Sequence, residues 1–114
     1  MRRRRGGLSG GDDLQVAATE ARAHYNVAIE QGEAALHATK AEAIAPACRT
    51  ATAALAAARY GHGWVVATAK ARGIPLNTDP DRPKRAEAAV LACWDHAVQT
   101  ALRAASWEAT KTRW

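Results

Sequence analysis

The sequence predicts an all-α fold, an antiparallel bundle of three alanine-rich helices that follows a flexible arginine-rich arm. About a quarter of the 114 residues are alanine, and phenylalanine is absent. Alanine enters a helix at the lowest cost of any residue and fills little space, so this composition favours helices packed at close range. Small residues also recur at alternating steps of four and three, which is the spacing of a helix-packing seam. We expect a basic arm over residues 1–11 and a single domain over residues 12–114.

The first helix is expected to begin near Asp12. Ser9 and Asp12 have the spacing of a capping box, and the side chains of Asp12 and Asp13 favour the positive end of a helix dipole. The helix should end or kink near Ile44, because Pro46 cannot continue a regular helix. Its predicted seam consists of Leu14, Ala18, Ala21, Tyr25, Ala28, Gly32 and Ala35.

A second helix is expected over residues 47–72, followed by a loop over residues 73–83 that is rich in proline and turn residues. Asp81 and Pro83 predict the opening of a third helix within the end of that stretch. A fourth helix remains open if Gly32 or Gly61 breaks a helix. The predicted core face of the third helix is Val90, Leu91, Trp94, Ala97, Val98, Ala101, Leu102 and Ala105.

Two aromatic residues of the second helix fall on the side opposite its predicted seam. That seam comprises Ala47, Ala51, Ala54, Leu55, Ala58, His62, Val65, Val66 and Ala69. Tyr60 and Trp64 lie on the outward side and need a partner. We expect a second helix of the same domain to cover them, with stacking on bases or a subunit interface as the alternatives.

Charge is divided unevenly along the chain. Residues 2–5 carry +4, residues 6–45 a net charge of −4, and residues 46–114 a net charge of +5. A uniformly solvated surface needs no such division. The pattern therefore indicates an anionic partner or head-to-tail association of copies.

Basic and aromatic side chains share one edge of the third helix. The stripe contains Arg85, His96, Arg103, Trp107 and Trp114. Arginine offers planar donors to phosphate, and an indole offers a stacking surface to an unpaired base. The alternative for this stripe is a solvated charged face. The candidate nucleic-acid-binding residues are Arg49, Arg59, Lys70, Arg85, His96 and Arg103, and the candidate stacking or interface residues are Tyr60, Trp64 and Trp107.

Neither a metal site nor a catalytic set emerges from the spacing. Glu33 and His37 share a helix without the second copy that a di-iron bundle requires, and Cys93 with His96 lacks the further ligands of a zinc site. Cys48 and Cys93 are too few for a disulfide framework, so we expect buried thiols in a reducing compartment. We therefore expect no enzyme activity and no cofactor.

The chain contains no apolar run of the roughly 20 residues that cross a bilayer. The arginines at residues 2–5 are followed by glycines rather than by the apolar region of a signal peptide. We expect a soluble cytoplasmic protein without a membrane partner.

In size, helical character and basic helix surfaces the chain resembles the small subunit of multi-subunit CRISPR effector complexes, including the type IV variety. The residues that support the resemblance are Arg49, Arg59, Lys70, Arg85 and Arg103. It implies a non-enzymatic subunit, present in several copies, that lines a filament bound to guide RNA and helps to hold a single-stranded target. Residues 81–90 are also similar to segments of some helical bacterial immunity proteins, which implies a protein-binding or antitoxin-like module instead.

Overall fold

The computed structural model describes residues 12–113, with side chains described as far as Ala109. Three helices account for most of this part of the chain: α1 (Asp12–Ala35), α2 (Ala41–Arg72) and α3 (Asp81–Arg113). The predicted all-helical class is confirmed for the described residues. The predicted basic arm, the capping role of Ser9 and the place of Trp114 in the stripe fall outside them.

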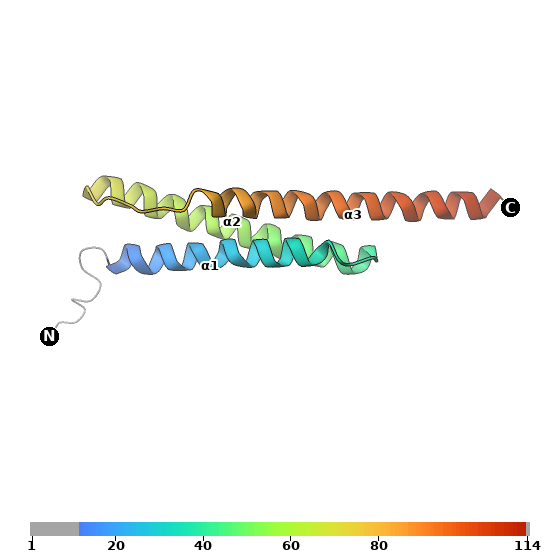
Figure 1. Cartoon of the computed structure of the whole chain (residues 1–114), viewed down its shortest axis with the longest axis horizontal. Coiled ribbons are helices and arrows are strands. Elements are labelled where there is room, and N and C mark those ends of the chain that lie inside the picture. The colour runs from blue at the N-terminus through green and yellow to red at the C-terminus, as the bar shows by residue number, and fades with distance from the viewer. Residues whose placement is uncertain (1–11, 114) are drawn as a thin grey trace.

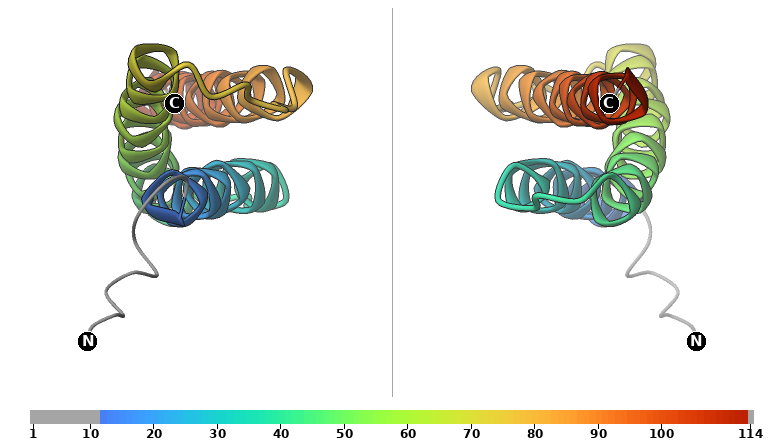
Figure 2. Two further views of the ribbon diagram at one scale, coloured as in Figure 1. Left: turned by 90° about the vertical axis from the view of Figure 1, so that its left-hand side faces the viewer. Right: turned by 90° about the vertical axis from the view of Figure 1, so that its right-hand side faces the viewer.

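The helices form an elongated body of 78 × 26 × 18 Å. Figure 1 shows α1 and α3 running the same way along the long axis, with α2 returning across both of them. Seen end on, α1 and α3 lie one above the other, and α2 spans them on one side (Figure 2). Each helix therefore contacts the other two, and one whole face of α2 points away from its neighbours.

The core is a row of three small clusters built largely from alanine. The central cluster contains Tyr25, Ala28, Ile29, Ala51, Ala54, Leu55, Ala58, Ala86 and Val90. One end cluster contains Leu14, Val65 and Ala69, and the other contains Ala35, Ile44, Cys48 and Cys93. The predicted seam of the first helix is buried at every position except Ala18, which is half-buried. Small side chains at these positions bring the helix backbones close together.

At Gly32, α1 approaches α3 closely. A Cβ atom at this position would lie 2.8 Å from the carbonyl oxygen of Ala89 and 3.0 Å from its Cβ atom. Only a residue without a side chain fits that distance, so the glycine permits the contact and does not break the helix. Gly61 also lies inside a continuous helix, so the described residues form three helices and not four.

The boundary between α1 and α2 lies earlier than the sequence predicts. The expected end near Ile44 is wrong: α1 ends at Ala35, and α2 begins at Ala41, six residues before the predicted start at residue 47. A tight turn separates them, in which the N–H of Ala38 donates to the carbonyl of Ala35 at 3.1 Å. Pro46 lies inside α2 with its ring exposed. Its missing N–H removes one hydrogen bond in the second turn of the helix, just after the N–H groups of Ala43 and Ile44, which both donate to the carbonyl of Lys40.

The end of α2 follows the sequence prediction. Gly73 adopts a left-handed conformation with φ of 68°, and its N–H donates to the carbonyl of Lys70. The N–H of Ile74 donates to the carbonyl of Ala69, which completes a Schellman motif. The loop then ends at residue 80, and α3 begins at Asp81 as predicted. The carboxylate of Asp79, which the sequence analysis did not single out, accepts the N–H of Asp81.

Most of the predicted core face of the third helix is wrong. Val90 is buried and Ala97 is half-buried, but the rest of that face is exposed. The exposed members are Leu91, Trp94, Val98, Ala101, Leu102 and Ala105. The buried residues of α3 are Ala86, Ala89, Val90 and Cys93. The helix therefore packs on its smaller side chains and leaves the larger apolar stripe uncovered.

Cys48 and Cys93 form a disulfide that links α2 to α3, with 5.7 Å between their Cα atoms. The expectation of two free thiols is therefore wrong. Both residues are fully buried and belong to the cluster that contains Ala35 and Ile44. Two cysteines 45 residues apart carry no spacing signal for a bond, because the pairing depends on where the helices cross.

Candidate functional site

The last part of α3 extends past the ends of α1 and α2, as Figure 1 shows. We refer to residues 98–109 as the projecting segment. The residue before it, Ala97, packs on the disulfide cluster, and Thr100 is still half-buried. From residue 101 onward every described side chain is exposed. The segment therefore offers the full circumference of a helix to partners.

Arg103 and Trp107 occupy one edge of the projecting segment, four residues apart and so one turn from each other. The side chain of Trp107 is 64% exposed. Arg103 is exposed and forms no ion pair within the described residues. Val98 and Leu102 lie on another edge, and Leu102 is 58% exposed. A cationic and aromatic edge thus lies beside an apolar one.

Intramolecular partners hold two of the predicted phosphate-binding arginines. Arg85 donates to both carboxylate oxygens of Glu33 at 3.0 and 3.1 Å, and these hydrogen bonds raise its pKa. Arg59 forms an ion pair with Glu87 on α3. Each guanidinium already donates to a carboxylate, so fewer of its N–H groups are available to bind a phosphate.

His96 forms a hydrogen bond within the bundle. Its Nε2–H donates to the backbone carbonyl of Ala38 at 2.7 Å, and its ring is half-buried. A carbonyl that follows the end of α1 needs such a donor, because it has no partner within the helix. His96 thus joins α3 to the turn between α1 and α2.

Arg49 and Lys70 are exposed and form no ion pair within the described part of the chain. They lie 21 positions apart on α2, and a helix rises 1.5 Å per residue, so about 30 Å separates them along its axis. The structure therefore does not gather the six predicted nucleic-acid-binding residues into one patch. Among the described residues, Arg103 with Trp107 is a predicted pair of a cationic and an aromatic side chain that stays together and exposed.

Tyr60 and Trp64 lie on the uncovered face of α2, where they are 83% and 42% exposed. The expectation that a helix of the same domain covers them is wrong within the described residues. Both side chains line a groove of about 480 Å³ between α1 and α2. Its other lining residues are Ala17, Glu20, Ala21, His24, Ala57 and Gly61. The groove thus combines two aromatic side chains, four small residues and the polar side chains of Glu20 and His24.

Among the described residues, no three side chains of the His, Cys, Asp or Glu type gather closely enough to hold a metal ion. No described helix is long and apolar enough to cross a membrane.

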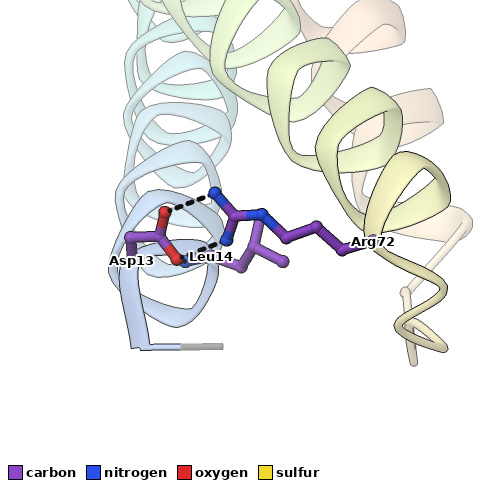
Figure 3. Close-up of polar contacts among 3 residues, drawn as sticks. All are labelled: Asp13, Leu14 and Arg72. Carbon is purple, nitrogen blue, oxygen red and sulfur yellow. Dashed lines mark hydrogen bonds and ion pairs between the residues drawn. The ribbon is translucent and has the colours of Figure 1, made fainter. Parts of the chain in front are cut away.

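The acidic first helix pairs with the basic helices of the same molecule. Arg72 at the end of α2 donates to both carboxylate oxygens of Asp13 at 2.9 and 3.1 Å, and Asp13 also accepts the N–H of Leu14 (Figure 3). The hydrogen bonds from Arg72 are the largest cause of a lowered pKa at Asp13. Together with the pair of Glu33 and Arg85, this contact accounts for part of the charge division within the chain itself. The uneven charge along the sequence indicated an oppositely charged partner, but it did not indicate that this partner lies partly in the same chain.

We expect Arg72→Gln to raise the pKa of Asp13 toward its ordinary value of 3.8, which an NMR titration of the carboxyl carbon measures. Because the folded-state pKa is lowered, the pair stabilises the fold above the unfolded pKa, and this contribution disappears as pH falls through the lowered value. The thermal midpoints of wild type and Arg72→Gln should therefore differ at neutral pH and converge below about pH 4. Lys70→Gln removes the same charge from the same end of α2 and should leave the titration of Asp13 unchanged. A titration curve of Asp13 that Arg72→Gln does not shift contradicts the ion pair.

The comparisons with known proteins give no match: no protein-family model fits the chain, and neither the curated proteins nor the solved structures include a significant relative.

Proposed function

We propose that the chain is a non-enzymatic helical subunit of a nucleoprotein assembly, of the CRISPR small-subunit kind, that contacts a nucleic-acid backbone and neighbouring protein subunits. The observation that supports this proposal is the projecting segment of α3. An isolated helix end with exposed Leu102 and Trp107 exposes apolar surface to water unless a partner covers it. A segment that combines apolar, aromatic and cationic side chains suits an assembly of protein and nucleic acid.

Arg103 and Trp107 form the proposed contact with guide RNA or a single-stranded target. The guanidinium of Arg103 binds a phosphate, while the indole of Trp107 stacks on an unpaired base. Residues 98–114 carry three basic residues and one acidic residue, so the charge of this end favours a polyanion. Nothing in this pair reads base identity, so the proposed recognition is of the backbone and of unpaired bases in general.

The apolar edge of the projecting segment forms the proposed contact with a neighbouring subunit. Leu91, Val98 and Leu102 are all more than half exposed and lie along one side of α3. Residues at these spacings are the anchors that an amphipathic helix inserts into a groove of another protein. Arg49 and Lys70 then supply secondary phosphate contacts that lie away from the projecting segment.

The test is the affinity for labelled single-stranded RNA and DNA of the same sequence, measured by fluorescence anisotropy across a salt series. Arg103→Ala should lower the slope of log affinity against log salt by about 0.7, the value for one lost phosphate contact on a single strand. Trp107→Ala should weaken binding by about 1–3 kcal/mol, as for a lost stacking contact, and leave the salt slope unchanged.

The matched control is Glu33→Ala combined with Arg85→Ala, which removes an internal ion pair without changing the net charge. This control should bind as wild type does. Absent binding, or binding whose salt slope Arg103→Ala does not alter, contradicts the nucleic-acid contact. A tight complex with a single protein toxin, formed without nucleic acid, would support the immunity-protein or antitoxin-like alternative, which the exposed apolar edge of α3 also favours.

A further inference from the structure

The uncovered face of α2 carries a second helix-packing seam. Six residues recur along it at alternating steps of four and three: Ala53, Ala57, Tyr60, Trp64, Ala67 and Ala71. We refer to these six residues as the α2 seam. All six are exposed, and α1 and α3 both pack on other sides of the helix (Figure 2). This spacing is that of a coiled-coil contact, and no described helix supplies the partner.

The order of residues in the α2 seam is nearly the same in both directions about His62. Consider α2 of a second copy that runs in the opposite direction and is related by a two-fold axis at the level of His62. Each alanine of the seam then faces an alanine, and each aromatic residue faces an aromatic residue. Ala53 then faces Ala71 of the second copy, and Ala57 faces its Ala67. Tyr60 faces Trp64 across the centre. A two-fold interface needs a surface that is complementary to itself, and the α2 seam has this property.

The groove beside the seam gives the central aromatic residues a place to bind. It lies between α1 and α2 at the level of the proposed axis, and its volume is about 480 Å³. Trp64 leans toward this groove as one of its walls. In the two-fold arrangement, Trp64 of the second copy reaches the level of Tyr60, where Ala57 and Gly61 leave space for an indole. Each copy both inserts an aromatic side chain and receives one.

Charge and area both suit a second copy as the occupant. None of the six seam residues is charged, so the two seams meet without repulsion; Glu20 and His24 of α1 line the groove beside the seam. The seam is about 27 Å long at the helical rise, and α1 and α2 together present a strip about 20 Å wide. Two such strips bury at least about 1,000 Å², which reaches the lower bound for a specific interface.

We propose that the chain forms a two-fold dimer in which the α2 seams of two copies pack in opposite directions and exchange Trp64 into each other's groove. The inference deepens the proposed assembly role and rests on it, because it adds a contact between two copies of the chain to the subunit contact proposed for the apolar edge of α3. The dimer is measured without nucleic acid, whereas the RNA contact is measured by binding to labelled strands. Either proposal can therefore be contradicted without the other.

The test is the mass of the full chain in solution by sedimentation equilibrium, without nucleic acid. We expect twice the chain mass of 12.1 kDa. Ala57→Glu and Ala67→Lys should each weaken the dimer by about tenfold or more, because each places an unpaired charge in the seam. Combining them in one chain should restore the dimer, because Glu at 57 then faces Lys at 67 of the second copy. The two positions lie about 15 Å apart within one helix, too far to pair with each other.

The matched control is Ala88→Glu, at an exposed alanine of α3 away from the seam, which should leave the mass at twice that of one chain. Circular dichroism checks that each variant keeps its helix content. If either change at 57 or 67 unfolds the chain, the end pair Ala53→Glu and Ala71→Lys tests the same register. A monomeric wild type overturns the proposal, as does a dimer that the single changes leave intact. A combined variant that does not regain the dimer mass also overturns the proposal. In a parallel pairing each new charge would face the same charge of the second copy, so the dimer would not be restored.

Discussion

Replacing both Cys48 and Cys93 with alanine is expected to lower the free energy of unfolding by about 4 kcal/mol. The disulfide closes a loop of 45 residues, and the loss of unfolded-state entropy on closing a loop of that length gives a stabilisation of this size. A small domain has a total stability of about 5–15 kcal/mol, so the change removes a large share of it. Chemical denaturation of wild type and of the double alanine variant measures the difference.

A reductant provides the control for this experiment. Wild-type protein denatured in the presence of dithiothreitol should lose about as much stability as the double alanine variant does, whereas the variant itself should not respond to the reductant. Both cysteines are fully buried beside Ala35 and Ile44, so the double alanine variant also loses the packing of two sulfur atoms and should be slightly less stable than the reduced wild type. Equal stability of wild type with and without reductant would show that the bond does not stabilise the fold.

Gly32→Leu is expected to destabilise the fold by about 3 kcal/mol, at the upper end of what overpacking a core costs. The first side-chain atom would already lie 2.8 Å from a backbone oxygen of Ala89, and a backbone cannot rotate away as a flexible side chain does. The helices α1 and α3 must therefore separate, which also disturbs the neighbouring pair of Glu33 and Arg85. Urea denaturation curves of wild type and variant give the change.

Gly63→Ala is the matched control, because Gly63 also lies inside a helix but a Cβ atom there meets nothing within 4 Å. Its replacement should stabilise the protein by roughly 0.5–1 kcal/mol, since alanine is the better helix former. Gly32→Ala should destabilise despite the same gain in helix propensity. If both alanine variants are more stable than wild type, the close approach at Gly32 is wrong.

Local signals predicted the start and the packing seam of the first helix, though not its end, and the loop after the second helix. The residues of the seam from Leu14 to Ala35 recur at helical spacing and so share one face of α1. Because these residues are apolar, that face is the one that packs against the other helices. Gly73 ends α2 because glycine adopts the left-handed conformation at little cost, and the start of α3 at Asp81 follows from acidic and proline residues that favour a first turn. These are short-range effects, and neighbouring residues suffice to specify them.

Longer-range choices in α3 were not predictable in the same way. The helix carries a large apolar stripe through Leu91 and Leu102 and a smaller one through Ala86 and Cys93. Hydrophobicity favours burial of the larger stripe, and the structure buries the smaller one. The reason is the short distance between helices that Gly32 and Ala89 impose, since only small side chains fit between backbones so close together. Because the larger stripe is exposed, it forms part of the candidate site on α3 and not part of the core.

The sequence by itself determined that the described chain is helical, where the loop before α3 lies, and which residues share each helix face. Tertiary structure alone decided which face meets a neighbour, that Cys48 bonds to Cys93, and that Arg59 and Arg85 are held by carboxylates while Arg103 remains open. The physical reason is that helical periodicity fixes the angles between side chains on one helix. It does not fix how that helix is rotated against the next, which the fit of all three surfaces decides together.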